Sequence, residues 1–285
     1  MELIKTELIK ITEIPSNVYE SITKEIGWYS IGLGRLQRYK NGEDFYLIGS
    51  GTLIRIGESY GILTAQHVTA LFRDCEEVGF IISPGVHKLV VEIEHLHVID
   101  IAKPSKPSNG PDLSVVILPA TLLGTFKATK SFYNISNKRE EVLQSSLDLD
   151  VGVWILFGFI DEQTIAEGPD RGFTIIKGFH GLCGATGIAK AYIRGDYDFL
   201  EVGAQCGDSK LLPVSYGGAS GGGLWRVQLI RSKEGDIQNR DPILYGVAFY
   251  QTEMKEGMRY IRCHGPHSIY QRVFEVINNG FNKRT

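Results

Sequence analysis

The feature that most constrains the fold is a long succession of short apolar segments separated by Gly, Pro, Asn and Asp. This pattern is typical of an all-β sandwich or barrel. The segments of the first half span residues 30–39, 46–56, 61–65, 78–82, 87–98 and 113–118. Those of the second half span residues 151–159, 173–179, 186–193, 199–204, 222–230, 243–251 and 258–263. We therefore predict two β-units of similar strand number, although the halves share no sequence repeat.

Two short helices are expected at the ends of the chain. Asn17 and Glu20 have the spacing of a capping box, and Pro15 stands just ahead of them, which predicts a helix over about 17–26. A second helix is predicted from about Ser268, since its apolar residues share one helical face. These residues are Ile269, Val273, Val276 and Ile277.

The connections between the apolar segments suggest how the chain is divided. Residues 102–111 form a Pro-rich loop, and the charged stretch 134–150 is predicted to be a solvated connector. We expect a first unit over residues 1–125, a connector over 126–150 and a second unit over 151–285.

Composition excludes several functional classes. The 285 residues are 43% hydrophobic and 22% charged, and no apolar run is long enough to span a bilayer, so no membrane association is expected. The net charge of −3 and the scattered basic residues argue against nucleic-acid binding. Charged residues also interrupt the stretch where a signal peptide needs an apolar run, which predicts a cytoplasmic protein. They are Glu2, Lys5, Glu7 and Lys10.

The cysteines and histidines give no strong metal-binding pattern. Four cysteines without an export signal are expected to be reduced thiols, namely Cys75, Cys183, Cys206 and Cys263. Cys263, His264 and His267 could suggest zinc, but no second Cys pair at ligand spacing completes a set. We therefore expect no metal and no organic cofactor.

A serine stands in an unusually bare context in VSYGGASGGGLW, residues 214–225, where five glycines surround Ser220. An isolated Gly/Ser run is most often a flexible loop. A nucleophilic serine, however, needs donors for the oxyanion that develops on the attacked carbonyl. The missing side chains would let the amides of Gly218 and Ser220 point into one small hollow.

A serine nucleophile also needs a base, and His67 is the strongest of the seven histidines. In GSGTLIRIGESYGILTAQHV, residues 49–68, it follows directly after a predicted hairpin and could face a cleft. Taken alone, such a residue is more often a histidine with a structural hydrogen bond.

The third requirement is a carboxylate that orients the imidazole. Asp112 in SNGPDLSVVILP precedes an apolar strand, and Asp100 in HVIDIAKP is the rival candidate. A lone Asp at such a position is usually a turn or cap residue.

The three stretches ILTAQHV, PDLSVVILP and GGASGGGLW resemble the signature blocks of trypsin-like, chymotrypsin-fold serine peptidases, in that family's order of His, Asp and Ser. Spacings of 45 and 108 residues also fit. The resemblance implies two six-stranded antiparallel Greek-key β-barrels with a short N-terminal and a C-terminal helix. It makes His67 the general base, Asp112 its partner, Ser220 the nucleophile, and the amides of Gly218 and Ser220 the oxyanion hole.

The resemblance also implies how a protein or peptide substrate is held. The segment LYGVAFYQ ends in Phe249, Tyr250 and Gln251, which resemble the family's substrate-pairing edge. Val214 falls at the floor of the primary specificity pocket, where an apolar residue argues against a demand for Lys or Arg.

Departures from the secreted members of the family suggest a different mode of control. Ala219 replaces the acid that commonly precedes the serine, and no activation-cleavage site is evident. The sequence is closer to intracellular bacterial or viral-type members. We expect a serine endopeptidase of narrow specificity, controlled by an activating or inhibiting protein partner, in a bacterial stress or defence setting.

Two other interpretations remain. GASGG fits the nucleophile elbow of α/β-hydrolases, but that fold needs a helix directly after the serine, and GGGLWRVQLI is strand-like. The second is a catalytically silent pseudo-peptidase that uses the same fold as a peptide-binding or interaction module.

Overall fold

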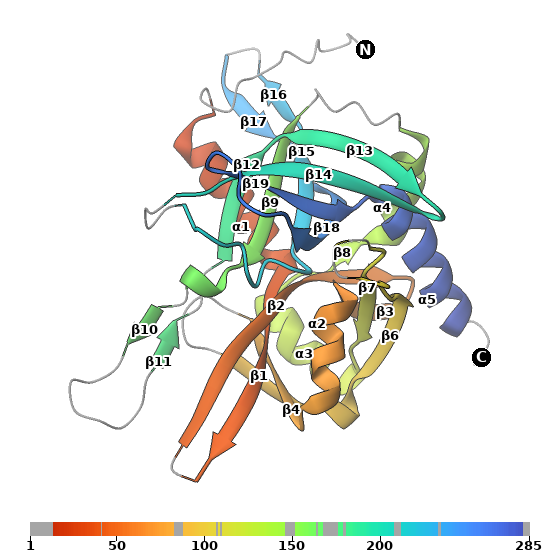
Figure 1. Cartoon of the computed structure of the whole chain (residues 1–285). Helices are drawn as coiled ribbons and strands as arrows, with labels where there is room; N and C mark the ends of the chain where they lie inside the picture. The colour runs from red at the N-terminus through yellow and green to blue at the C-terminus, as the bar shows by residue number, and fades with distance from the viewer. Residues whose placement is uncertain are drawn as a thin grey trace.

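The protein is built mainly from two antiparallel β-sheets, which lie one above the other in Figure 1. The computed structural model describes residues 14–40, 42–82, 88–106, 108, 110–145, 152–163, 165–167, 176–178, 181–207, 212–232 and 235–281. The prediction of a mostly β chain with antiparallel strands is confirmed. The N-terminal stretch interpreted for export signals lies largely outside the described residues.

The first sheet has the strand order β5-β4-β1-β2-β3-β7-β6, and the short β8 pairs in parallel with β2. Its strands are β1 (Ser30–Tyr39), β2 (Gly42–Ile56), β3 (Ser59–Thr64), β4 (Glu77–Ile81), β5 (Lys88–Glu92), β6 (His97–Ala102), β7 (Leu113–Ile117) and β8 (Tyr133–Asn134). Side chains two residues apart share a strand face, so Ile31 and Leu33 of β1 enter one apolar core together with Leu53 and Phe80.

The second sheet has the order β12-β9-β15-β18-β19-β14-β13. Its strands are β9 (Val153–Phe159), β12 (Gly181–Thr186), β13 (Ile188–Arg194), β14 (Tyr197–Gln205), β15 (Gly223–Val227), β18 (Ile243–Gln251) and β19 (Met258–His264). Two separate ribbons pair β10 (Ile165–Glu167) with β11 (Ile176–Gly178) and β16 (Leu229–Arg231) with β17 (Ile237–Asn239).

The sheets differ from the expected pair of six-stranded barrels. They contain eight and seven strands, and the ladders between described residues close neither of them. Strands β5 and β6 are the outer strands of the first sheet, and β12 and β13 those of the second.

Two of the predicted segments contain breaks. Residues 87–98 do not form one strand, because a 3₁₀ turn at Ile93–His95 separates β5 from β6. Residues 222–230 divide into β15 and β16 at Gln228. Of the segment 173–179, only Ile176–Gly178 lies within the described residues, where it forms β11.

Five α-helices and several shorter helical segments complete the described chain. The α-helices are α1 (Ser16–Tyr29), α2 (Gln66–Ala70), α3 (Ala120–Thr129), α4 (Ile135–Gln144) and α5 (Phe274–Phe281). The shorter segments are three 3₁₀ turns, η2 (Leu71–Asp74), η3 (Ile93–His95) and η5 (Asp161–Gln163), and one π-helix, η6 (Ser268–Val273). The C-terminal helix predicted from Ser268 thus begins as η6 and continues as α5.

The N-terminal helix exists, but its predicted capping box is wrong. Pro15 occupies the N-cap position in an extended conformation, and its carbonyl accepts from the amides of Val18 and Tyr19. The helix therefore begins at Ser16, and Asn17 lies inside it, where its side chain makes no cap hydrogen bond.

The predicted solvated connector over residues 134–150 is also wrong for its described part. Asn134 caps α4 by accepting a hydrogen bond from the Asn137 amide. Ile135 and Val142 lie seven residues apart on one face of the helix and are buried in the core. Because α4 also packs against η6, this segment is part of the folded body, and the division at residues 125 and 150 stays a prediction.

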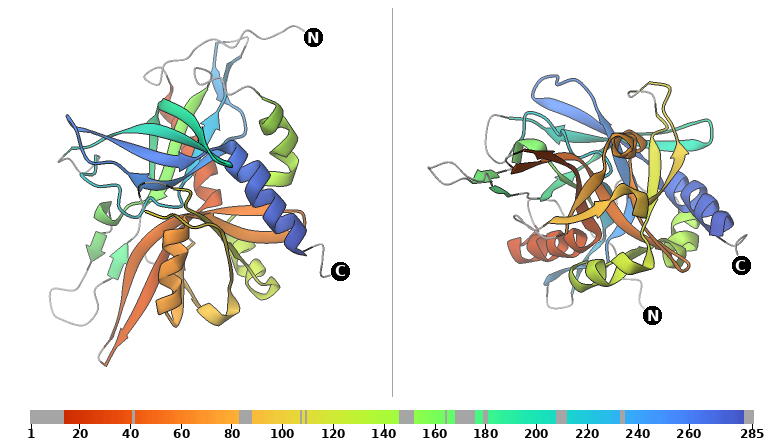
Figure 2. Two further views of the ribbon diagram at one scale, coloured as in Figure 1. Left: turned by 45° about the vertical axis from the view of Figure 1, so that its right-hand side comes forward. Right: turned by 90° about the horizontal axis from the view of Figure 1, so that it is seen from below.

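The two sheets are in direct contact through β9, which is buried along its whole length and packs against β1 and β2. Helix α5, dark blue in Figure 2, lies at the side of the two sheets and contacts β2 of the first. Within the described residues, every helix is too short or too polar to cross a membrane.

Candidate active site

His67 and Asp112 come together because β3 and β7 are antiparallel neighbours. Thr64 pairs with Ser114 in that ladder, so the residues just after β3 lie opposite those just before β7. His67 is the second residue of α2, and Asp112 directly precedes β7. The register of the first sheet thus positions both side chains at the same strand ends.

Two hydrogen bonds join these residues. The Nδ1 atom of His67 lies 2.6 Å from Asp112 Oδ2, and the His67 amide donates to Asp112 Oδ1 at 2.9 Å. The Asp112 side chain is fully buried, whereas that of His67 is 38% exposed. With the proton on Nδ1 directed at the carboxylate, the imidazole keeps Nε2 as an acceptor on its accessible side.

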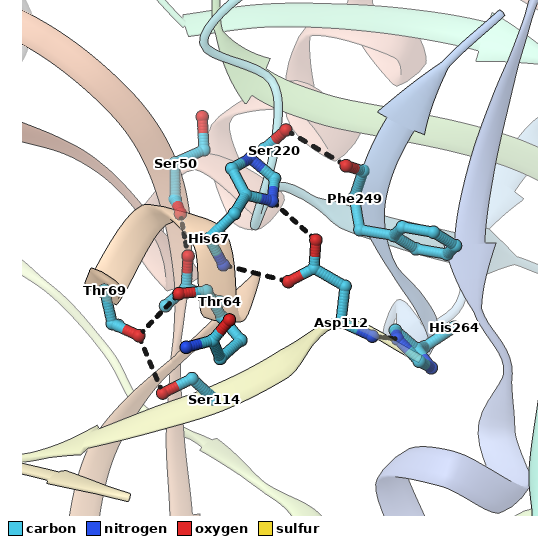
Figure 3. Close-up of polar contacts among 10 residues, drawn as sticks. Ser50, Thr64, His67, Thr69, Asp112, Ser114, Ser220, Phe249 and His264 are labelled. Carbon is cyan, nitrogen blue, oxygen red and sulfur yellow. Dashed lines mark hydrogen bonds and ion pairs between the residues drawn. The ribbon is translucent and has the colours of Figure 1, made fainter. Parts of the chain in front are cut away.

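The short helix α2 is itself fixed to β7. The Thr69 hydroxyl donates to the Ser114 hydroxyl at 3.0 Å (Figure 3). Ser114 Oγ in turn donates to the Ile99 carbonyl of β6. The amide that His67 directs at Asp112 therefore belongs to a helix held in place by buried polar contacts.

Asp100, the rival carboxylate, is directed elsewhere. It is an exposed residue whose carboxylate pairs with Arg73 Nη2 at 2.8 Å and accepts from Gln66 Nε2 at 3.4 Å. Asp112 is therefore the carboxylate that contacts His67.

The loop that carries Ser220 packs against the first sheet. The Ser220 carbonyl accepts from the Ser50 amide of β2 at 2.7 Å. Gly221 has a φ of +89°, and a Cβ there would overlap the Ser50 carbonyl and the Thr64 hydroxyl. This glycine lets the loop that carries Ser220 approach the strands that lead to His67.

The amides around Ser220 are divided between bonded and free ones. The bonded amides and their acceptors are Gly217 to Ser215 Oγ, Ala219 to Tyr216 O, Gly221 to Ala248 O and Gly222 to Ala219 O. Within the described part of the chain, the amides of Gly218 and Ser220 donate to no acceptor.

The conformation of Gly218 accounts for this arrangement. Its φ is +91°, and its carbonyl turns away to accept from Ser50 Oγ at 2.7 Å. Ser50 Oγ also accepts from the Phe159 amide of β9 at 2.8 Å, which ties the loop to both sheets. The two residues predicted for the oxyanion hole are thus the two with unpaired amides.

The Ser220 hydroxyl has one hydrogen-bond partner among the described residues. It donates to the Phe249 carbonyl of β18 at 3.5 Å, and no hydrogen bond joins it to His67 (Figure 3).

The predicted substrate edge ends β18. The ring of Phe249 is buried against His264, and its carbonyl accepts from Ser220 Oγ. Tyr250 is partly buried under the Arg262 guanidinium. Gln251 Oε1 accepts from the Tyr216 amide at 2.9 Å, so its side chain bridges β18 and the segment before Ser220.

Val214 lies at the surface and does not form the floor of a closed pocket, since the residue is 40% exposed. Its amide and that of Ser215 donate to the two carboxylate oxygens of Glu162, each at 2.8 Å. Arg259 Nε donates to the Val214 carbonyl at 3.0 Å. Sequence reasoning missed Glu162, because no motif marks a carboxylate 52 residues before the segment that it holds.

The residues considered for zinc have other contacts. The Cys263 side chain is fully buried, His264 accepts a hydrogen bond from the Asp112 amide, and the His267 amide donates to Asp198. Among the described residues, close metal-ligand atoms gather only at Glu92, Glu94 and His95, all of them exposed.

The elbow of an α/β-hydrolase does not fit this site. Ser220 is followed by a turn and then by β15, with no helix between them. Comparison with models of protein families gives no match, and no curated protein matches the chain.

Proposed function

We propose that the protein is a serine endopeptidase that acts through a Ser220, His67 and Asp112 triad. One observation supports this proposal above all. The buried Asp112 carboxylate binds His67 Nδ1, while the unpaired amides of a glycine-rich loop flank Ser220. Base, orienting acid, nucleophile and oxyanion donors are the four parts that acyl transfer by a serine requires.

In the acylation step, His67 Nε2 takes the proton of Ser220 as Oγ attacks the carbonyl carbon of the scissile bond. The oxyanion that forms accepts from the amides of Gly218 and Ser220. Asp112 stabilises the imidazolium without accepting its proton. The C–N bond then breaks, and His67 Nε2 gives the proton to the leaving amine.

Deacylation repeats the same steps with water. His67 removes a proton from water, whose oxygen attacks the acyl carbon, and the second tetrahedral intermediate breaks the bond to Ser220 Oγ. The proton returns to the serine, and the acid product leaves. The mechanism assigns no step to a metal or an organic cofactor.

On this proposal, the two sheets correspond to the two barrels of a chymotrypsin-like fold, each with an open seam. The substrate is an extended protein segment that pairs with the end of β18 at Phe249, Tyr250 and Gln251. Val214 is a surface contact for the same segment. The enzyme works in the cytoplasm on few proteins, under the control of a protein partner.

A pseudo-peptidase that only binds peptides is the second candidate, and one observation favours it. The Ser220 hydroxyl is directed at the Phe249 carbonyl and not at His67. If that rotamer persisted with substrate bound, the site would hold a peptide without cleaving it.

Covalent labelling with a fluorophosphonate, followed by intact mass, separates the two candidates. We expect one adduct on Ser220 of the wild type, no adduct on Ser220→Ala, and strong slowing in His67→Ala. Turnover of a cleavable peptide by Ser220→Ala should fall by about 10⁶. A wild type that stays unlabelled, alone or with host lysate added, would support the binding module.

A further inference from the structure

A second histidine lies behind the triad. His264 ends β19 and is fully buried. Its ring is surrounded by those of Phe249, Phe199 and Tyr197, with centroids at 4.9, 5.2 and 5.9 Å. Such close packing on several sides leaves the imidazole little freedom to turn.

The ring of His264 makes one hydrogen bond, and this bond reaches the triad. Its Nε2 accepts from the Asp112 amide at 2.9 Å, the contact drawn as a dashed line in Figure 3. Because Nε2 is the acceptor, the neutral ring must carry its proton on Nδ1. That Nδ1 atom is buried and has no partner in the described part of the chain.

Burial keeps His264 in the form that can accept. It lowers the pKa of the imidazole from 6.5 to about 4, although the charges of Asp112 and Asp198 oppose the shift. At neutral pH the ring is therefore uncharged, and Nε2 retains its lone pair.

The same ring also connects to the nucleophile. Phe249 packs against His264 with its side chain and accepts from Ser220 Oγ with its carbonyl. His264 thus contacts both Asp112, which binds His67, and Phe249, whose carbonyl accepts a hydrogen bond from Ser220. His264 belongs to the second sheet, whereas Asp112 directly precedes β7 of the first.

We propose that His264 is a positioning residue that holds the Asp112 backbone across the contact between the two sheets. This inference rests on the proposed function, since it assigns His264 to the same triad. An Asp112 amide without its acceptor would be a buried, unsatisfied donor. The carboxylate would then shift relative to His67 Nδ1, and a displacement of about 1 Å can cost a factor of about 10² in rate.

The test compares His264→Phe, which keeps a ring but loses the acceptor, with Phe199→Leu, which loosens the same cluster but keeps Nε2. We expect fluorophosphonate labelling of His264→Phe to be slower by about 10². Phe199→Leu should label at close to the wild-type rate despite a lower free energy of unfolding. His264→Gln, whose side-chain carbonyl can accept a hydrogen bond from the Asp112 backbone amide, should recover part of the rate. Equal slowing in His264→Phe and Phe199→Leu would overturn the proposal.

A second measurement does not require activity. The low-field proton resonance of His67 Nδ1 reports its hydrogen bond to Asp112, and we expect it to move in His264→Phe but not in Phe199→Leu. If His264→Phe does not fold, the ¹⁵N chemical shifts of the wild-type His264 ring test the proposal instead. A proton on Nδ1 supports the acceptor role of Nε2, and a proton on Nε2 contradicts it. An unlabelled wild type with these NMR results would contradict only the proposed function. A labelled wild type whose rate and His67 resonance do not change in His264→Phe would contradict only the role of His264.

Discussion

At the scale of single residues, the environments of two carboxylates decide which of them can serve the triad. Asp112 is fully buried and accepts from both the ring and the amide of His67. Asp100 is exposed and neutralised by Arg73. A buried carboxylate with fixed donors holds an imidazole in one tautomer, whereas a solvated one that already has a cation partner cannot.

Asp112→Asn should therefore slow acylation by about 10⁴, since an amide NH₂ directed at Nδ1 favours the wrong tautomer of His67. The rate of fluorophosphonate labelling, or of peptide turnover, measures the effect. Asp100→Asn is the matched control and should leave the rate close to that of the wild type. A large loss in the control with little change in Asp112→Asn would reverse the assignment.

The blocks around His67, Asp112 and Ser220 can be picked out from the sequence because each is local, and the structure brings His67 and Asp112 into contact. His264 was visible only as a possible metal ligand, since its acceptor role depends on a residue 152 positions away. Ser50 gave no signal at all, because its contacts with Gly218 and Phe159 exist only after the sheets meet.

At the scale of elements, the segment before Ser220 is hydrogen-bonded by side chains from three elements, η5, β18 and β19. Glu162 binds the amides of Val214 and Ser215, Gln251 binds the Tyr216 amide, and Arg259 binds the Val214 carbonyl. Each contact fixes the backbone that leads to the free Gly218 amide. These side chains hold the segment in a chain that has Ala219 in place of the acidic residue found before the serine in the secreted peptidases that the sequence resembles.

Glu162→Gln should slow acylation, because the glutamine NH₂ replaces one of the two carboxylate oxygens and, being a donor, cannot accept from the backbone amide that it faces. We expect a loss of about tenfold, less than the 10²–10³ that removal of a whole oxyanion donor costs. Labelling rate is the measurement, with Glu253→Gln as a control that removes an exposed carboxylate from the β18–β19 connection. Equal rates for the two variants would mean that Gln251 and Arg259 hold the segment without Glu162.

Elements differ in how far the sequence predicts them. The bounds of β1 and β18 match the predicted ranges. Strands β5 and β6 were predicted as one, since nothing local marks the turn stabilised by the Glu76 carbonyl and the Ile93 amide. Helix α4 was read as a connector because its charges outnumber the two buried residues that dock it.

At the scale of the whole molecule, the candidate site exists only where the two sheets meet. The first sheet supplies His67 and Asp112, and the second supplies the Ser220 loop, Phe249 and His264. The sheets are joined at this point by Ser50 on one side and by the His264 to Asp112 hydrogen bond on the other. Any change that separates the sheets should therefore affect labelling and stability together.

The burial of His264 predicts how global stability depends on pH. Its pKa is about 4 when folded, against 6.5 ordinarily, so between these values the unfolded chain binds a proton that the folded chain does not. Stability therefore falls as pH decreases through this window, and His264 accounts for up to about 3 kcal/mol of the loss.

Urea unfolding of the wild type and His264→Phe at several pH values measures the difference, in which groups common to both proteins cancel. We expect the free energy of unfolding of His264→Phe to depend less steeply on pH over the same window. Parallel curves for the two proteins would contradict this prediction, since they would mean that His264 is protonated as easily in the folded chain as in the unfolded one.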